Sequence, residues 1–220
     1  MSAKNTIKSY SLNSFYHLYN RGVEKRLIFM DEQDYNVFQS YLETYLLPKD
    51  QNSLKNLLEN GNPKEKDTAR KLLRLNNFSD QIKLLAYCLM PNHFHLLIHQ
   101  KEADSIDKFS NSLFTRYSMY FNKKYKRVGP LFQDLYKAIL VQSEEQLLWL
   151  SRYIHRNPKD SLQGSPLQSY KHSSYSEYLK NKTRKWIKSE EILSYFQSPY
   201  KEFVEGHNLQ PESLYPLLLE

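Results

Sequence analysis

The chain has 220 residues, of which 40% are hydrophobic, and it carries 31 Lys and Arg against 24 Asp and Glu for a net charge of +7. No apolar run approaches the roughly 20 residues that cross a bilayer, so we expect a soluble globular domain with extensions and no membrane partner. The one cysteine, Cys88, excludes an internal disulfide. The N-terminal segment lacks an apolar signal core, which favours the cytoplasm, and the basic balance favours partners that carry phosphates.

The first part of the chain predicts one strand, one long helix and a polar segment. Residues 15–21 alternate aromatic with polar side chains, a pattern typical of a strand. Asp31 is the expected N-cap of a helix over residues 32–46, whose apolar side chains recur at helical spacing. Residues 48–80 are polar and rich in Asn and Lys, with a helical pattern only around residues 68–75. We therefore expect a surface insertion at 48–80.

The second part predicts a hairpin, two helices and a further strand. Residues 81–90 and 93–100 are apolar strands joined by a short turn, and residues 104–125 carry an apolar helical stripe. A strand over residues 137–141 follows, and the helix after it begins at a capping box at Ser143 and ends near Asn157, before a proline. This order indicates an α+β fold, a small antiparallel sheet of about four to five strands flanked by helices.

Two histidines within the hairpin are the most informative feature of the sequence. His93 and His95 are separated by Phe94, so on a strand both imidazoles point to one face while Phe94 points to the other. Paired imidazoles on one face are natural ligands for a divalent cation. The alternative is that both are polar residues of a half-exposed strand, which the apolar neighbouring segments disfavour.

The helix over residues 143–157 supplies a second pair of polar groups. Tyr153 and Asn157 are four residues apart and therefore project from one face of that helix. If this face meets His93 and His95, the amide oxygen of Asn157 completes a metal site and the Tyr153 phenol is a candidate nucleophile. Packing alone would also explain Tyr153, which is one tyrosine among 18.

Aromatic and basic side chains alternate near the end of the helix over residues 104–125. Such a mixture offers stacking surfaces beside phosphate-seeking charge, but it is equally typical of a helix with an aromatic core face and solvated lysines. Both interpretations stay open for this cluster, whose members are Tyr117, Tyr120, Phe121, Lys123, Lys124, Tyr125, Lys126 and Arg127.

Taken together, these motifs resemble those of the single-tyrosine HUH transposases, specifically the REP-associated tyrosine transposase group of the IS200-like family. The resemblance runs over most of residues 15–178. It rests on the segments YHLYNRG (16–22), MPNHFHLL (90–97), YFN with RVGPLFQ (120–122 and 127–133), RYIHRNP (152–158) and SSY (173–175).

The resemblance implies an HUH/ferredoxin-like topology and a metal-dependent enzyme that cleaves and rejoins single-stranded DNA next to hairpin elements. It implies Tyr153 as the nucleophile of a 5′-phosphotyrosine intermediate, with His93, His95 and Asn157 as ligands of Mg²⁺ or Mn²⁺. The partner is then single-stranded DNA with REP-like hairpins, and both a homodimer and a monomer stay open. The candidate DNA-binding residues are Arg21, Lys123, Lys124, Lys126, Arg127 and Lys137, although Arg21 and Lys137 could pair with carboxylates instead.

Two segments depart from the family pattern or extend it. Asp134 and Leu135 stand where a glycine and a basic residue are expected, and the polar insertion at 48–80 is longer than expected. We expect an HUH nuclease domain over residues 1–160, with that insertion, and a basic, largely helical C-terminal extension over residues 161–220. The basic run at 180–188 is either a second DNA-contacting surface or a solvated linker.

Two other functions are compatible with the same sequence. One is a non-catalytic DNA-hairpin-binding protein on the same fold. The other is a metal-dependent hydrolase in which water attacks, which is weakened by the absence of an obvious general base beside the histidines. A covalent adduct between DNA and Tyr153 would distinguish the enzyme from both.

Overall fold

A four-stranded antiparallel sheet forms the centre of the protein, for which a computed structural model describes residues 10–207 and 210–218. The strands lie in the spatial order β2-β3-β1-β4, so His93 and His95 of β3 lie on an inner strand. The predicted α+β fold and its four strands are confirmed. Their bounds are Ser14–Arg21 for β1, Ile82–Met90 for β2, His93–Gln100 for β3 and Lys137–Leu140 for β4.

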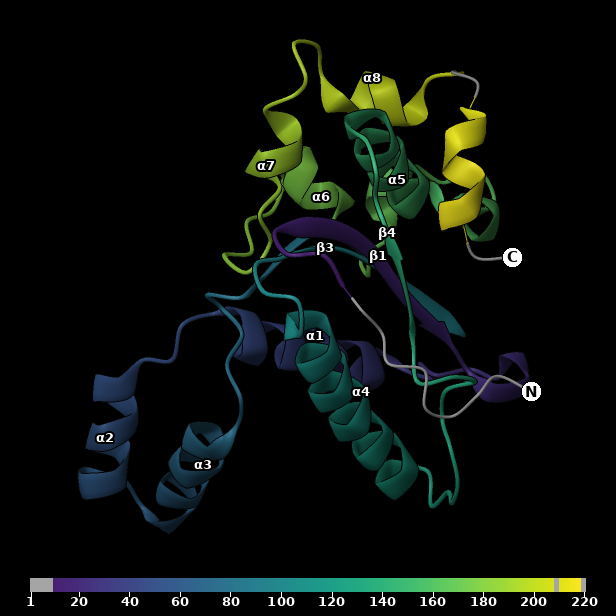
Figure 1. Ribbon diagram of the computed structural model, residues 1–220. Helices are drawn as coiled ribbons and strands as arrows, with labels where there is room; N and C mark the ends of the chain where they lie inside the picture. The colour runs from purple at the N-terminus through teal and green to yellow at the C-terminus, as the bar shows by residue number, and fades with distance from the viewer. Residues whose placement is uncertain (1–9, 208–209, 219–220) are drawn as a thin grey trace.

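Helices cover both faces of this sheet. Figure 1 shows α1 and α4 against one face and α5 with the short helices α6, α7 and α8 against the other. The longer helices are α1 (Glu32–Leu46), α2 (Gln51–Asn60), α3 (Pro63–Arg74), α4 (Ser105–Lys124) and α5 (Glu144–Arg156). The short ones are α6 (Tyr175–Tyr178), α7 (Glu190–Leu193) and α8 (Tyr200–Glu205), with 3-10 turns η1 (Val23–Lys25), η2 (Lys159–Leu162), η3 (Leu167–Ser169) and η4 (Glu212–Leu217). Every helix within the described residues is too short or too polar to span a membrane.

The expected helix starts are found at both predicted capping residues. The Asp31 side chain accepts a hydrogen bond from the Asp34 backbone N–H, and the Ser143 side chain accepts one from the Gln146 backbone N–H. The second cap differs from a capping box in one bond, because the Gln146 side chain accepts from the Gln142 N–H rather than from that of Ser143. The cap nevertheless fixes the start of α5, and with it the position of Tyr153 and Asn157 along the helix.

The polar segment at 48–80 is more ordered than its composition predicts. It contains two helices, α2 and α3, where the sequence pattern indicated only a short helical stretch around residues 68–75. Asp50 caps α2, and Asn62 caps α3 through a full capping box with Glu65. Figure 1 shows the two helices projecting away from the sheet. The Lys49 ammonium, just before α2, donates to the carbonyl oxygen of Leu73 near the end of α3 and so connects the two ends of the pair.

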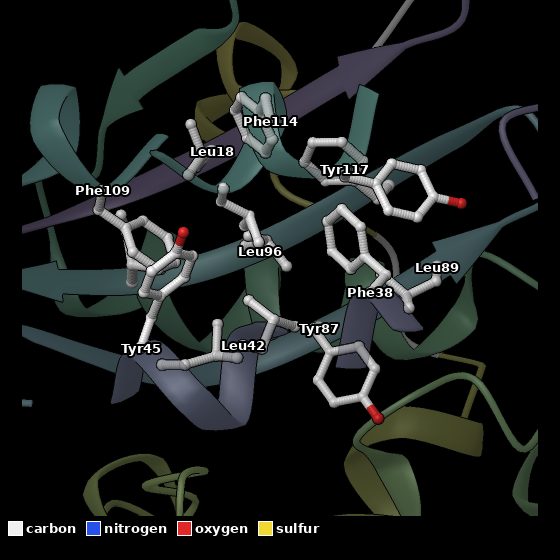
Figure 2. Close-up of a cluster of buried hydrophobic side chains, with 14 of the residues drawn as sticks. Leu18, Phe38, Leu42, Tyr45, Tyr87, Leu89, Leu96, Phe109, Phe114 and Tyr117 are labelled. Carbon is white, nitrogen blue, oxygen red and sulfur yellow. The ribbon is translucent and has the colours of Figure 1, made fainter. Parts of the chain in front are cut away.

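Alternation along β3 divides its side chains between two apolar cores. Phe94, Leu96 and Ile98 point into the core beneath α1 and α4, where Figure 2 shows Leu96 among the aromatic rings of Phe38 and Tyr117. The residues between them face α5 instead, where Leu97 joins the second core. His93 and His95 lie on this second face, so the core on one side of β3 fixes the direction of the imidazoles on the other.

The basic and aromatic cluster at the end of α4 is largely part of the core. The Tyr117 and Phe121 rings are at most 1% exposed. The Tyr120 and Tyr125 hydroxyls donate to the buried Asp34 carboxylate, with O···O distances of 2.9 and 2.8 Å. Of the two interpretations left open by the sequence, the structure therefore favours the packing one for these four aromatic residues.

The C-terminal segment packs against the same sheet as the rest of the chain. Tyr175, Ile192 and Val204 are buried in the second core, and the Lys188 backbone N–H donates to the Leu84 carbonyl on the edge strand β2. Backbone groups of residues 172–174 pair with β2 near Tyr87 in the same way. This segment thus covers one edge of the sheet, while a domain boundary at residue 160 stays a prediction.

Removing an aromatic ring from the core beneath α1 and α4 tests this packing. Phe38 is fully buried and contacts Phe29, Phe94 and Tyr117, so Phe38→Ala should lower the free energy of unfolding by about 3–5 kcal/mol in urea denaturation. Met119→Ala, on the exposed side of α4, is the control and should change it by less than about 0.5 kcal/mol. Equal losses in both variants would contradict the assignment of this core.

The Asp34 carboxylate predicts an acid-sensitive contact between α1 and α4. Burial alone would raise its pKa, but hydrogen bonds from Lys124, the Met30 N–H and Tyr125 hold the pKa below its ordinary value. The stabilisation is therefore present at neutral pH and is lost as the pH falls through that lowered pKa. The unfolding free energies of the wild type and Asp34→Asn should differ at pH 7 and converge toward pH 3, whereas Asp67→Asn, in an exposed pair, should show little difference at either pH.

Candidate active site

Side chains of β3 and α5 converge on one point, although they are about 60 residues apart in the sequence. The His93 Nε2 lies 3.1 Å from the Asn157 Oδ1, and the Asn157 Nδ2 lies 3.2 Å from the His95 Nε2. The Tyr153 ring lies one helical turn earlier, with its centre 5.3 Å from that of His95. The structure thus brings together all four residues that the sequence singled out.

The strand register and the hairpin turn set the position of the two histidines. His93 and His95 pair across β1 with Arg21 and Tyr19, so both imidazoles lie at the end of the sheet where the β2–β3 turn begins. Backbone N–H groups from the segment after β1 donate to the Pro91 carbonyl and hold this turn. His95 is fully buried and His93 is half-buried, which leaves one side of the site accessible.

The hydrogen bonds around His93 leave a lone pair directed at Asn157. The Asn92 amide nitrogen donates to the Lys25 carbonyl, so its oxygen faces the His93 Nδ1 at 2.7 Å and accepts a hydrogen bond from it. In a neutral imidazole the Nε2 is then an acceptor. Burial, and then the charge of Arg21, lower the pKa of His93 although the nearby Asn157 oxygen raises it, so the neutral ring is favoured. Two acceptors, this Nε2 and the Asn157 oxygen, therefore face each other.

A cation between these groups would satisfy them. The His93 Nε2 and the Asn157 Oδ1, which are 3.1 Å apart, are close enough to bind one cation together. Within the described residues no group of three or more His, Cys, Asp or Glu side chains could hold a metal ion. A metal at this point would thus need the Asn157 amide oxygen as its third protein ligand, and two imidazole nitrogens with one amide oxygen are a donor set for a divalent cation.

A third histidine, His17 on β1, orients the His95 ring by contacting the ring nitrogen that does not face Asn157. Its Nε2 lies 2.9 Å from the His95 Nδ1, and its Nδ1 donates to the Leu217 carbonyl in η4. Because a carbonyl only accepts, His17 carries its proton on Nδ1 and accepts the proton of His95 Nδ1 at its Nε2. The His95 Nε2 lone pair is therefore directed toward Asn157.

His17 lies within the segment YHLYNRG, whose pattern alone indicates no role for it. The available signal was its alternation with Tyr19, which places both side chains on one face of the first strand. Nothing in the sequence says that this strand lies beside β3. The contact with Leu217, 200 residues away, likewise needs the folded chain.

Burial keeps these imidazoles neutral. Desolvation lowers the pKa of His17 to about 4 and holds the pKa of His95 well below its ordinary value, with the charges of His17, His93 and Arg21 adding to the second effect. Neutral imidazoles are the form that binds a metal ion. All three rings therefore stay in this form at neutral pH.

The predicted DNA-binding residues occupy different places. Arg21 lies beside His93, directly at the site, and the Lys137 ammonium lies 5.9 Å from the centre of the Tyr19 ring on the neighbouring strand. The other four, Lys123, Lys124, Lys126 and Arg127, lie at the end of α4.

Two of these four residues form ion pairs or hydrogen bonds with other side chains of the protein. Lys124 forms ion pairs with Asp31 and Asp34, and Arg127 donates to the Asn122 side chain. Lys123 and Lys126 are exposed. The structure thus gives Lys124 a packing role, and DNA contacts by the remaining residues stay predictions.

The comparison with family models identifies the segment that carries the site. Residues 56–157 match the family model described as "Transposase IS200 like". This segment contains His93, His95, Tyr153 and Asn157, and it ends before the C-terminal segment that contacts His17. The resemblance to IS200-like transposases is therefore confirmed over these residues, and it supports a role in DNA processing.

No curated protein matches this chain. A solved structure described as a REP-associated tyrosine transposase bound to a REP hairpin is similar at 8% identity, with a TM-score of 0.45. That similarity covers 80% of this chain and 86% of the other chain.

Proposed function

We propose that the protein is a metal-dependent DNA strand transferase that cleaves and rejoins single-stranded DNA next to hairpin, REP-like elements. The observation that carries the proposal is the convergence of His93, His95, Asn157 and Tyr153 at one end of the sheet. The family match over residues 56–157 and the sequence resemblance support the substrate class.

The residues of the site divide into a nucleophile and a ligand set. His93, His95 and Asn157 would hold the metal ion. Bound Mg²⁺ or Mn²⁺ supplies positive charge that polarises the scissile phosphate and stabilises the charge that develops on its oxygens. Arg21, beside His93, adds a second positive charge on the accessible side of the site.

In the proposed reaction Tyr153 transfers the DNA strand in two steps, cleavage and rejoining. Its phenolic oxygen attacks phosphorus in line, the O–P bond forms, and the bond from phosphorus to the 3′ oxygen breaks. The phenolic proton is released and the leaving strand takes up a proton as a free 3′-hydroxyl. The 5′ end stays on Tyr153 as a phosphodiester, so a 3′-hydroxyl of another strand can reverse the reaction without a nucleotide cofactor.

Removal of the phenolic oxygen tests this assignment. A labelled hairpin with single-stranded flanks, taken from inverted repeats beside the gene, is incubated with the protein and Mn²⁺ and then denatured. The wild type should form a covalent protein–DNA adduct, and Tyr153→Phe should form none because it lacks the attacking oxygen. Tyr170→Phe is the control, since the Tyr170 hydroxyl donates to the Leu89 carbonyl outside the site.

The outcomes separate the proposed enzyme from its alternatives. Cleavage that forms no adduct, and that Tyr153→Phe still carries out, would indicate a hydrolase in which water attacks. Tight hairpin binding without any cleavage would indicate a non-catalytic binding protein. Equal adduct formation by the wild type and Tyr153→Phe would refute the role of Tyr153.

We further propose that His17 positions His95 for metal binding. His17→Phe removes the acceptor of the His95 Nδ1 proton, so the affinity for Mn²⁺, measured by the EPR signal of the free ion, should fall about 10- to 100-fold. His17→Gln keeps an acceptor and should recover part of the affinity. His99→Phe makes the same change farther along the same face of β3 and should leave the affinity unaltered; an equal loss there would contradict the role of His17.

A further inference from the structure

A cavity of about 250 Å³ adjoins the candidate active site on the α5 side. Tyr153 and Asn157 form one part of its lining, Trp149, Arg152 and Arg156 form another, and Asp160 and Gln210 complete it. The first five residues come from α5 or its C-cap, at spacings of three and four that place them on adjoining faces of the helix. The cavity is therefore continuous with the proposed nucleophile.

The two arginines bring two positive charges to a cavity whose lining contains one carboxylate, that of Asp160. The Arg152 guanidinium donates to the carbonyls of Phe203 and Gly206, each at 2.7 Å, and that of Arg156 donates to the Val204 carbonyl at 2.7 Å. Among residues 10–207 and 210–218, neither guanidinium forms an ion pair with an acidic side chain. Burial, and then the charge of Arg156, lowers the pKa of Arg152, which shows that the two charges oppose each other. A bound anion would relieve this repulsion.

These bonds also fix the arginines in place. Their acceptors are the carbonyl groups at the end of α8, where a helix presents partial negative charge. Arg152 is only 6% exposed. The guanidinium groups are thus held before any ligand arrives, which lowers the entropic cost of binding one.

Trp149 adds an aromatic surface to the same cavity. The Arg152 guanidinium lies 4.9 Å from the centre of its ring, and the Phe203 ring meets it edge to face at 5.2 Å. The ring is therefore held in one orientation while it lines the cavity. A fixed indole beside cationic groups is the arrangement that binds a base and its phosphate in single-stranded nucleic acid.

We propose that this cavity binds one nucleotide of single-stranded DNA, with its base against Trp149 and a backbone phosphate at Arg152 and Arg156. The inference rests on the proposed function and extends it to a nucleotide subsite. In an in-line attack the leaving 3′ oxygen lies opposite the Tyr153 oxygen, so the departing strand points away from α5. The nucleotide in the cavity is then the one on the 5′-linked strand, which stays on Tyr153.

Salt-dependent binding in the absence of metal tests the subsite apart from the chemistry. The probe is a fluorescent DNA hairpin with a ten-nucleotide thymidine tail on each side, titrated in EDTA at several salt concentrations. Arg156→Gln keeps an N–H donor for the Val204 carbonyl but removes the charge. It should weaken binding and reduce the slope of log K against log salt by about 0.7, the value for one phosphate contact in single strands.

Lys159→Gln is the matched control, because it removes the same charge from an exposed residue three positions farther on that does not line the cavity. It should leave the slope unaltered. An equal reduction in both variants would mean that only the overall charge matters and would overturn the subsite. An unaltered slope in Arg156→Gln would overturn it as well.

Fluorescence gives a second measurement that does not depend on an arginine variant. Trp186→Phe leaves Trp149 as the only tryptophan, and the probe should then quench its emission through base stacking. Probe binding without quenching would overturn the subsite while leaving the proposed function intact. If the wild type binds no probe and forms no Tyr153 adduct, the proposed function fails together with the subsite.

Discussion

The alternation of side chains along β3 connects the core of this protein to its chemistry. Phe94 and Leu96 are held between α1 and α4, and this packing fixes the backbone whose other face carries His93 and His95. A slip of one residue in the register would turn both imidazoles into the apolar core, where nothing could bind them. The same packing that stabilises the fold therefore also orients the two imidazoles proposed to bind the metal.

The face of the sheet opposite α1 and α4 is completed by residues from distant parts of the chain. The helix α5 supplies Tyr153 and Asn157, and η4 supplies the carbonyl that sets the proton position of His17. A chain of hydrogen bonds thus runs from Leu217 through His17 and His95 to Asn157. Through it, the C-terminal segment is connected to the site by hydrogen bonds.

Helix α5 has three functions that its sequence pattern alone would not separate. Its apolar stripe, with Leu150 and Ile154, packs on the sheet. A second face presents Tyr153 and Asn157 to the histidines. A third carries Arg152 toward the end of α8, where main-chain carbonyls hold the guanidinium. Because one rigid helix carries all three, packing on the sheet positions the proposed nucleophile relative to both the proposed metal ligands and the cavity.

Local periodicity and helix caps in the sequence predict the order of elements, the two imidazoles on one face of β3 and the spacing of Tyr153 and Asn157. They do not predict α2, whose polar residues give little apolar periodicity, and they leave the aromatic rings of α4 undecided between packing and DNA. The folded chain is needed to show that β1 lies beside β3, that His17 contacts His95, and that two arginines of α5 donate to main-chain carbonyls of α8 and Gly206. These facts depend on strand order and on contacts across as many as 200 residues, which no local pattern encodes.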